Sequence, residues 1–277
     1  MDILEDIRLK LPSHDISNLF SNTLRLFTRN QDTKIGIHVH ALHKTASMFL
    51  YKFFKYICSF TDIHLYSINN TPPNHMDLST EIKHSFCSCP ERTFCTNNNI
   101  EKHTYIPKQY HIFQVRDPRD ILVSQCYSFG WIHGDKNWSE HALKEREYIR
   151  SINIDEYALM RSLKPSHTKT PCLLDRYQPI ISLTGKPNMV VVKYEDMVLN
   201  FKKWLDPIVN IFDFKHPEQV SQHLFEVFQS EFIIPSIEQR THKRKISPGD
   251  HIEKLKPKTI SNLNNIFSDI LEHFDYR

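Results

Sequence analysis

Three short apolar runs, each followed at once by a helical pattern, constrain the fold of this chain more than any other feature. Residues 34–40 form a β-branched run that stops at the polar residues 43–45. Residues 110–115 and 189–193 are runs of the same kind, and residues 201–212 then repeat apolar side chains at helical spacing. Strands and helices that alternate in this way predict an α/β fold with a mostly parallel β-sheet flanked by helices.

The length of the chain favours one domain. With 277 residues, of which 40% are hydrophobic, the chain can bury one substantial core. We expect the domain to span residues 34–277, and residues 1–33 to form a helical extension packed on its outside. The last apolar pattern, residues 257–276, predicts a single helix that begins at a proline. Residues 69–108 show little periodicity and predict a long irregular segment.

Composition excludes several classes of function. A formal charge of +3 is too small and too dispersed for a general nucleic-acid binder. The N-terminus carries acidic residues where a signal peptide needs basic ones, and no apolar run reaches the roughly 18–20 residues of a membrane span. We therefore expect a cytoplasmic protein with no membrane span. Without a secretory signal, the 6 cysteines are expected to be reduced thiols.

The first run leads into a candidate anion site. A strand that ends in a short Lys-Thr-Ala-Ser loop, residues 44–47, and then opens a helix presents free amide N–H groups and the positive end of the helix dipole. Lys44 adds a full positive charge. The glycines of the G-x-x-x-x-G-K-[ST] pattern are absent, so this loop alone predicts little.

The second run leads into a second candidate phosphate site. Arg116 ends the strand, and Ser124 follows one or two helical turns into the next helix, so that both can hold one phosphate. At the start of that helix we expect Asp117 to cap, Pro118 to occupy the first helical position and Asp120 to complete a capping box. The chain therefore turns directly from strand into helix here.

Two further segments complete a recognisable set. Residues 242–250 are a basic cluster closed by a Pro-Gly turn, which fits a mobile loop that folds over a polyanionic ligand, and residues 194–197 read Tyr-Glu-Asp-Met after the third strand. In this order and approximate spacing, the four segments resemble the cytosolic sulfotransferases. The resemblance covers the chain from about residue 34 to the C-terminus and implies a P-loop-like sulfotransferase fold.

This resemblance implies a reaction. A sulfuryl group would pass from 3′-phosphoadenylyl sulfate (PAPS) to a hydroxyl of a small-molecule acceptor, leaving 3′-phosphoadenosine 5′-phosphate (PAP). Lys44 would bond the bridging oxygen, and Phe49 and Tyr194 would lie near the adenine. Arg116 and Ser124 would hold the 3′-phosphate, together with two residues of the closing loop. The donor-binding residues implied are Lys44, Thr45, Ala46, Ser47, Met48, Phe49, Arg116, Ser124, Tyr194, Arg244 and Lys245.

Two residues of the first loop depart from the family pattern. Ala46 replaces a glycine, which restricts positive φ, and Met48 replaces a hydroxyl residue that would bind phosphate. In the closing loop the family's glycine is Ile246, so Lys245 matches less well than Arg244. Since sulfuryl transfer resembles phosphoryl transfer, a lysine and backbone amides can meet the charge on the leaving phosphate without a metal.

The acceptor hydroxyl also needs a base. The family usually supplies a histidine from the segment before the second strand, where His103 is the first candidate; His133, just past the helix that carries Ser124, is the second. The aromatic residues near this helix would suit a lipophilic alcohol or phenol, and core packing explains them equally well. They are Tyr127, Phe129, Trp131 and Trp138.

Two other functions remain open from the residues. A P-loop nucleotide kinase would bind magnesium through a hydroxyl right after the lysine, and Thr45 occupies that position, but no aspartate closes the third strand. A zinc-stabilised binding module is suggested by a group of thiols and imidazoles, although their C-x-C-x5-C spacing matches no common structural site. That group is His84, Cys87, Cys89, Cys95 and His103.

Overall fold

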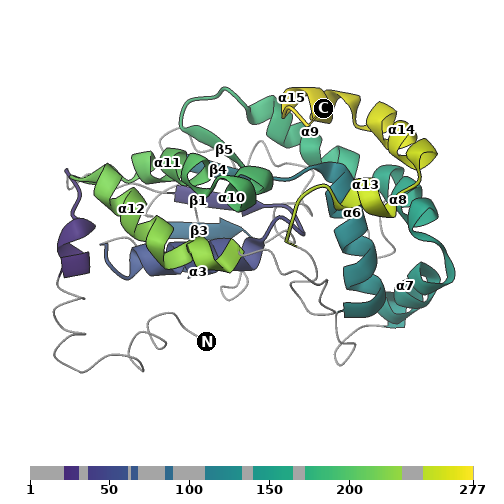
Figure 1. Cartoon of the computed structure of the whole chain (residues 1–277), viewed down its shortest axis with the longest axis horizontal. Coiled ribbons are helices and arrows are strands. Elements are labelled where there is room, and N and C mark those ends of the chain that lie inside the picture. The colour runs from purple at the N-terminus through teal and green to yellow at the C-terminus, as the bar shows by residue number, and fades with distance from the viewer. Residues whose placement is uncertain are drawn as a thin grey trace.

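The computed structural model describes residues 22–30, 37–61, 64–67, 85–89, 110–132, 140–164, 172–232 and 246–276. Five parallel strands form one sheet in the order β2-β3-β1-β4-β5. Figure 1 shows the helices that surround this sheet. The strands are β1 (Ile37–Ala41), β2 (His64–Ser67), β3 (Ser85–Cys89), β4 (Tyr110–Val115) and β5 (Met189–Lys193). The predicted α/β fold with a parallel sheet flanked by helices is confirmed.

Each of the three strands recognised in the sequence leads directly into a helix. β1 is followed by α3 (Ser47–Cys58), β4 by α6 (Pro118–Tyr127) and β5 by α10 (Tyr194–Leu199). The register pairs Ala41 with Gln114 and Val115 with Lys193, so these three strands end at the same edge of the sheet. The segments that follow them, which carry the predicted anion-binding residues, therefore meet at that edge.

Side-chain alternation along the strands gives the sheet two apolar faces. On one face Val39 and Ile112 pack into a core with α3, α10, α11 (Phe201–Ile211) and α12 (Pro217–Phe228). On the other, Phe113 and Val115 pack with α6 and four more helices. These are α8 (Ile154–Leu163), α9 (Leu173–Leu183), α14 (Pro257–Ile266) and α15 (Ser268–His273).

The helices after β1 and β4 therefore pack on opposite faces of the sheet. In open α/β sheets, the crevice where neighbouring connections diverge in this way, outside the carboxyl ends of the strands, is the usual ligand site. β1 and β4 are hydrogen-bonded neighbours, and Lys44 follows the first while Arg116 follows the second. The topology thus points to the ends of β1 and β4 as the functional edge.

Two sequence predictions about the fold are wrong. The C-terminal pattern forms two helices, α14 and α15, because Phe267 leaves the helical region at φ −101° and ψ 18°. The break keeps Leu263, Phe267 and Leu271 in the same core. The segment predicted to be irregular contains β3, whose sequence Ser-Phe-Cys-Ser-Cys has no β-branched residue. This strand depends on pairing with β1 and β2 rather than on local propensity.

The described part of the N-terminal region packs against the main core. Residues 22–26 are helical, Phe27 is buried, and its ring lies 5.4 Å from that of Phe214. Arg29 forms an antiparallel bridge with Phe214. Among the described helices, none combines the length and the hydrophobicity that a bilayer crossing requires.

Candidate functional site

A tight turn at the end of β1 carries the predicted lysine. The Thr45 amide donates to the Leu42 carbonyl at 3.2 Å, so that His43 and Lys44 are the two central residues of a β-turn. Lys44 has φ 70°, the positive value that the third residue of a type II turn requires. The Thr45 hydroxyl donates to the same carbonyl at 2.6 Å, which fixes the turn.

Ala46, the residue between this turn and α3, also has a positive φ, 66°. The alanine that replaces the family's glycine therefore keeps a left-handed backbone, and two non-glycine residues of one loop are strained, each by about 1–2 kcal/mol. Ala46 supplies no side-chain cap to α3. The first amides of the helix, at residues 47–49, are therefore left to a ligand or to water.

Two side chains from β4 and its end hold the turn in place. The Gln114 amide donates to the Thr45 carbonyl, and the Gln114 carbonyl oxygen accepts a hydrogen bond of 3.0 Å from the buried Trp204 indole. Arg116 Nη1 donates to the Lys44 carbonyl at 3.0 Å. Gln114 was not recognised from the sequence, where it reads as one polar residue within an apolar strand.

Arg116 is the central cation of the site. Its side chain is buried, its Cζ lies 4.1 Å from the centre of the Tyr194 ring, and its Nη2 lies 3.6 Å from Asp120 Oδ2. Burial by itself lowers the pKa of Arg116, but the surrounding groups, led by Tyr194 and Asp120, raise it overall. Arg116 Nε is buried and has no hydrogen-bond partner among the described residues. A charged donor in this position suits an anion.

The predicted capping box is wrong. Asp117 does cap α6, accepting from the Arg119 amide at 2.9 Å, but its own amide donates to Glu195 Oε1 at 2.9 Å. The Asp120 carboxylate does not accept from the Asp117 amide, as a capping box requires. It accepts from the Gly249 amide at 2.7 Å and from the amide and Nδ1 of His251 at 3.0 and 2.7 Å.

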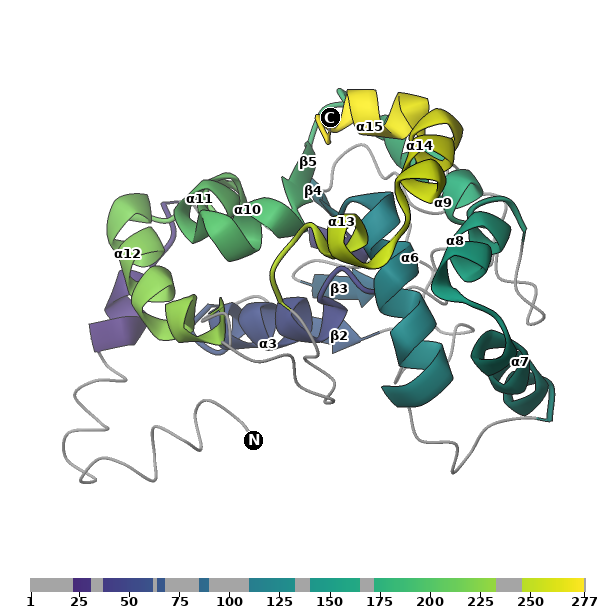
Figure 2. The same ribbon diagram turned by 45° about the vertical axis from the view of Figure 1, so that its right-hand side comes forward.

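Asp120 therefore joins α6 to the end of the basic loop. Gly249, with φ 87°, precedes the short helix α13 (Asp250–Lys254), which lies beside α6 (Figure 2). Burial would raise the pKa of Asp120, but the hydrogen bonds from His251 and the charge of Arg116 hold it well below its usual range. One buried carboxylate thus neutralises Arg116 and anchors the segment that follows the predicted closing loop.

A second carboxylate, that of the half-buried Glu195, lies in the first turn of α10. Burial raises the pKa of Glu195 to about 7, and the hydrogen bond from the Asp117 amide offsets only part of this effect. Nearby, the Tyr194 hydroxyl donates to the Ile246 carbonyl at 2.7 Å. The Tyr-Glu-Asp-Met segment therefore contacts both the start of α6 and the described end of the basic loop.

Phe49, in the first turn of α3, lies in an aromatic cluster. Its ring centre is 4.7 Å from that of Phe232 and 5.9 Å from that of Trp204. Phe232 ends a 3₁₀ turn, η4 (Gln229–Phe232), directly before the segment that contains the basic cluster. Phe232 was not recognised from the sequence, where its only signal is an aromatic residue upstream of the basic cluster. Such a cluster offers aromatic surface against which a flat ring system can pack.

Of the remaining predicted site residues, the structure describes some and leaves others outside the described ranges. Ser47 and Ser124 are half-buried, and Met48 is 67% exposed. Thr45 is completely buried, so it supports the turn instead of facing the open edge. This burial also removes the hydroxyl that a magnesium-dependent kinase would need after the lysine. His103, His133, Arg244 and Lys245 lie outside the described residues.

The zinc hypothesis rests mostly on undescribed residues. His84, Cys95 and His103 lie outside the described residues, and Cys87 and Cys89 are positions of β3. In the described part of the chain, no three His, Cys, Asp or Glu side chains form a group that could hold a metal. Cys58, Cys126 and Cys172 are free thiols.

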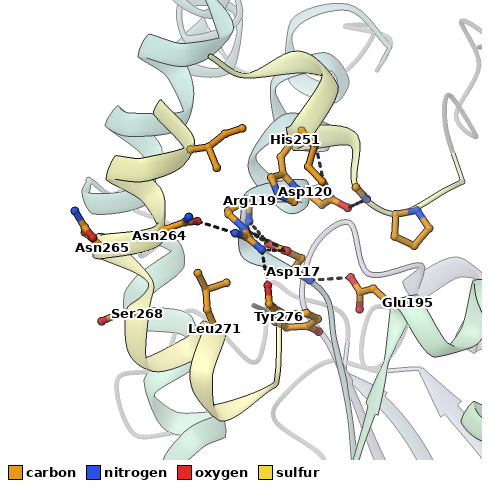
Figure 3. A pocket seen from close by; sticks show the side chains of 14 residues that line it. Asp117, Arg119, Asp120, Glu195, His251, Asn264, Asn265, Ser268, Leu271 and Tyr276 are labelled. Carbon is orange, nitrogen blue, oxygen red and sulfur yellow. Dashed lines mark hydrogen bonds and ion pairs between the residues drawn. The ribbon is translucent and has the colours of Figure 1, made fainter. Parts of the chain in front are cut away.

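A groove of about 790 Å³ lies next to the start of α6, where Asp117, Arg119 and Asp120 line it (Figure 3). Arg119 is at its centre and donates to Asp117 Oδ2 at 2.6 Å, to Asn264 Oδ1 at 2.6 Å and to the Tyr276 carbonyl at 2.7 Å. The guanidinium is therefore occupied by the protein itself. These bonds tie α14 and the C-terminal residues to the start of α6, which helps to hold the adjacent Arg116 in place.

Comparisons with known proteins identify the fold and the family. A solved structure of mouse sulfotransferase SULT7A1 complexed with PAP is similar over 92% of this chain and 89% of that chain, with 15% identity and a TM-score of 0.57, and shows the same fold. Retinol dehydratase in a complex with retinol and PAP matches over 91% of this chain and 86% of that chain, with 12% identity and a TM-score of 0.48. A search of curated proteins finds no match. A family model described as the sulfotransferase domain matches residues 99–275, well over half of the sequence, and the chain therefore belongs to the sulfotransferase family.

Proposed function

We propose that this protein is a PAPS-dependent sulfotransferase that transfers a sulfuryl group to a hydroxyl of a small-molecule acceptor, with residues 34–277 as the catalytic domain. One observation carries the proposal: Arg116 donates to the backbone of Lys44 at 3.0 Å. This bond brings two cations from separate strand ends to one edge of the sheet, as a donor with phosphates at both its 3′ and 5′ positions requires.

The residues at this edge fit the two ends of such a donor. The 3′-phosphate would be held by Arg116, whose Nε is buried without a partner among the described residues, and by Ser124. Arg244 and Lys245 would close over it. The 5′-phosphosulfate would be held by Lys44 and by the first amides of α3, at residues 47–49, which have no side-chain cap.

The adenine would lie near Phe49 and Tyr194. Phe49 belongs to the aromatic cluster with Phe232, and Tyr194 lies under the Arg116 guanidinium. Phe49 follows the turn that carries Lys44 in the sequence, and Arg116 connects Tyr194 to that turn through its bond to the Lys44 carbonyl. Thr45 and Ala46 contribute through the shape of the backbone, since the first is buried and the second has φ 66°.

Bound PAPS supplies the sulfuryl group. The protein's part is to place the acceptor oxygen in line with it, to take the acceptor proton and to stabilise the charge left on the 5′-phosphate. Lys44 serves the last purpose, and a lysine with backbone amides needs no metal for it. His103 and His133 remain the bases predicted from the sequence. The mouse sulfotransferase structure contains PAP, which supports this donor.

Calorimetric titration with PAP, without added metal, tests the proposal. Wild type should bind PAP, and Arg116→Ala and Arg244→Ala should each weaken binding about 10- to 100-fold, the loss expected for charge-assisted hydrogen bonds. Arg25→Ala, which removes an exposed arginine outside the site, is the matched control and should bind as wild type. If the folded wild-type protein does not bind PAP, the proposal is refuted. Binding of ATP that depends on magnesium would favour the nucleotide kinase instead.

A further inference from the structure

We propose that His43 is the general base that takes the proton from the acceptor hydroxyl, an assignment that rests on the sulfotransferase function proposed above. The candidates predicted from the sequence, His103 and His133, lie outside the described residues. His43 lies within the described site, and three observations about its position support this role.

The first observation is the turn itself. His43 and Lys44 are its two central residues, closed by the bond of 3.2 Å between the Thr45 amide and the Leu42 carbonyl. In-line transfer needs a cation at the leaving oxygen and a base at the attacking oxygen, on opposite sides of one sulfur atom. Adjacent side chains at the tip of one fixed turn can meet both requirements.

The second observation is the ring that orients His43. Its imidazole stacks on Phe129, with ring centres 5.0 Å apart and planes inclined by 27°. Phe129 belongs to a π-helical turn, η3 (Ser128–Ile132), which directly follows α6, the helix that carries Ser124. Such turns are frequent at functional sites. Arg146 and Arg150 donate to the carbonyls of residues 129 and 130 at 3.0 and 2.7 Å and hold this turn.

The third observation is the apolar surface beside this stack. Tyr127 and Trp131 have ring centres 5.9 Å apart, and Trp131 is 52% exposed. A lipophilic alcohol or phenol that packed against these rings would have its polar end near the half-buried His43. The acceptor wall and the base would then belong to the same short segment of the fold.

Five other histidines lie away from this turn. His40 and His111 are buried in the sheet, where their ring nitrogens lie 3.3 Å apart. His251 Nδ1 is hydrogen-bonded to Asp120 Oδ1 at 2.7 Å. His216 and His273 are exposed and lie at the start of α12 and the end of α15. Among the residues that the structure describes, His43 alone shares a turn with Lys44.

The acceptor oxygen forms a bond to sulfur while its proton passes to the neutral imidazole of His43. The bond between sulfur and the 5′-phosphate oxygen breaks, and its electron pair stays on that oxygen beside Lys44. The sulfated acceptor and PAP leave, and the imidazolium returns its proton to water.

Nuclear magnetic resonance of the histidine ring protons tests this placement without an acceptor. The His43 signal is assigned by its loss in His43→Gln and is titrated with pH, with and without saturating PAP and without metal. Because the phosphates of bound PAP would lie beside the imidazole, the midpoint of the His43 titration should rise by about 0.5 pH or more. The signal of His273 serves as the control and should not move.

Activity provides the second arm, with PAPS and a panel of simple phenols that includes 2-naphthol. His43→Gln should lower kcat about 100-fold or more and abolish the acidic limb of the kcat profile, while the Kd for PAP stays within about threefold of wild type. Added imidazole should restore part of the activity of His43→Ala. The exposed-site control His216→Gln should retain activity, and His103→Gln and His133→Gln are measured beside it as the competing assignments.

The outcomes separate the two proposals. Failure of wild type to bind PAP would refute the sulfotransferase function, and with it the role of His43. If PAP binds but the His43 titration is unchanged, or if His103→Gln or His133→Gln loses activity while His43→Gln keeps it, the assignment of the base is wrong and the function stands. If no phenol is turned over, the titration of His43 with PAP decides alone.

Discussion

Arg116 donates a hydrogen bond of 3.0 Å from Nη1 to the carbonyl oxygen of Lys44. The two residues lie 72 positions apart in the sequence and follow the neighbouring strands β1 and β4. Through this bond the predicted 3′-phosphate residue also sets the backbone of the residue predicted to meet the sulfuryl group. The geometry of one end of the donor site therefore depends on the other.

Relief of backbone strain at Ala46 should stabilise the loop. Ala46 has φ 66°, which glycine adopts without the clash of a Cβ atom. Ala46→Gly should raise the free energy of unfolding by about 1 kcal/mol and bind PAP at least as tightly as wild type, measured by denaturant unfolding and calorimetry. Ser47→Gly, one residue later in the helix, is the control and should lower stability. A loss of stability in Ala46→Gly would contradict the strain.

A hydroxyl at position 48 should improve donor binding. Met48 is 67% exposed in the first turn of α3, where residues 47–49 have no side-chain cap. Met48→Thr places a hydrogen-bond donor beside the predicted phosphate and should lower the Kd for PAP about 3- to 10-fold. Leu199→Thr, at an equally exposed site elsewhere, should leave the Kd unchanged. Equal effects of the two substitutions would place the phosphate away from α3.

Neutralising Asp120 should destabilise the fold and weaken donor binding. Asp120→Asn leaves the buried Arg116 without its carboxylate and weakens the anchor to His251, at a cost of about 3 kcal/mol. Because folding lowers the pKa of Asp120, its contribution is complete above the pKa of an unfolded aspartate, about 3.9, and is lost as the pH falls below it. The stability difference between wild type and Asp120→Asn, measured by urea unfolding, should therefore shrink from pH 6 to pH 3. A constant difference would exclude an ionised Asp120.

Glu195 should give the opposite pH dependence. Its pKa is raised to about 7, so between about pH 4.5 and pH 7 the folded chain binds a proton that the unfolded chain has released, and stability falls as the pH rises. Glu195→Gln stays neutral and should gain about 2 kcal/mol relative to wild type between pH 4.5 and pH 8. Comparing the two proteins at each pH removes the contribution of His223, whose pKa is lowered by burial. A gain that does not change with pH would mean that Glu195 is ionised throughout.

The sequence was sufficient for the strands and helices whose patterns are local. β1, β4 and β5 are apolar runs, and α3, α6 and α11 lie where the sequence predicts helices. The short helix α10, between β5 and α11, was not predicted. β3 was missed because its sequence has no strand propensity of its own and it forms by pairing with its neighbours. The break at Phe267 was missed because α14 and α15 together keep one helical apolar pattern.

The site could be predicted only in part. Lys44, Arg116 and Tyr194 were recognised by their positions after strands, and the structure brings them together. The partners of Asp120 could not be foreseen, because Gly249 and His251 lie about 130 residues further along the chain and meet it only through tertiary packing. Local capping rules therefore assigned Asp120 to the wrong bonds.

A crystal structure of the protein with PAP is the most direct test of the central claim. The account predicts the 3′-phosphate within hydrogen-bonding distance of the Arg116 guanidinium, including Nε, and the 5′-phosphate on the amides of residues 47–49 beside Lys44. Phosphates bound elsewhere, for example in the groove around Arg119, with the guanidinium of Arg116 left without an anion, would contradict it.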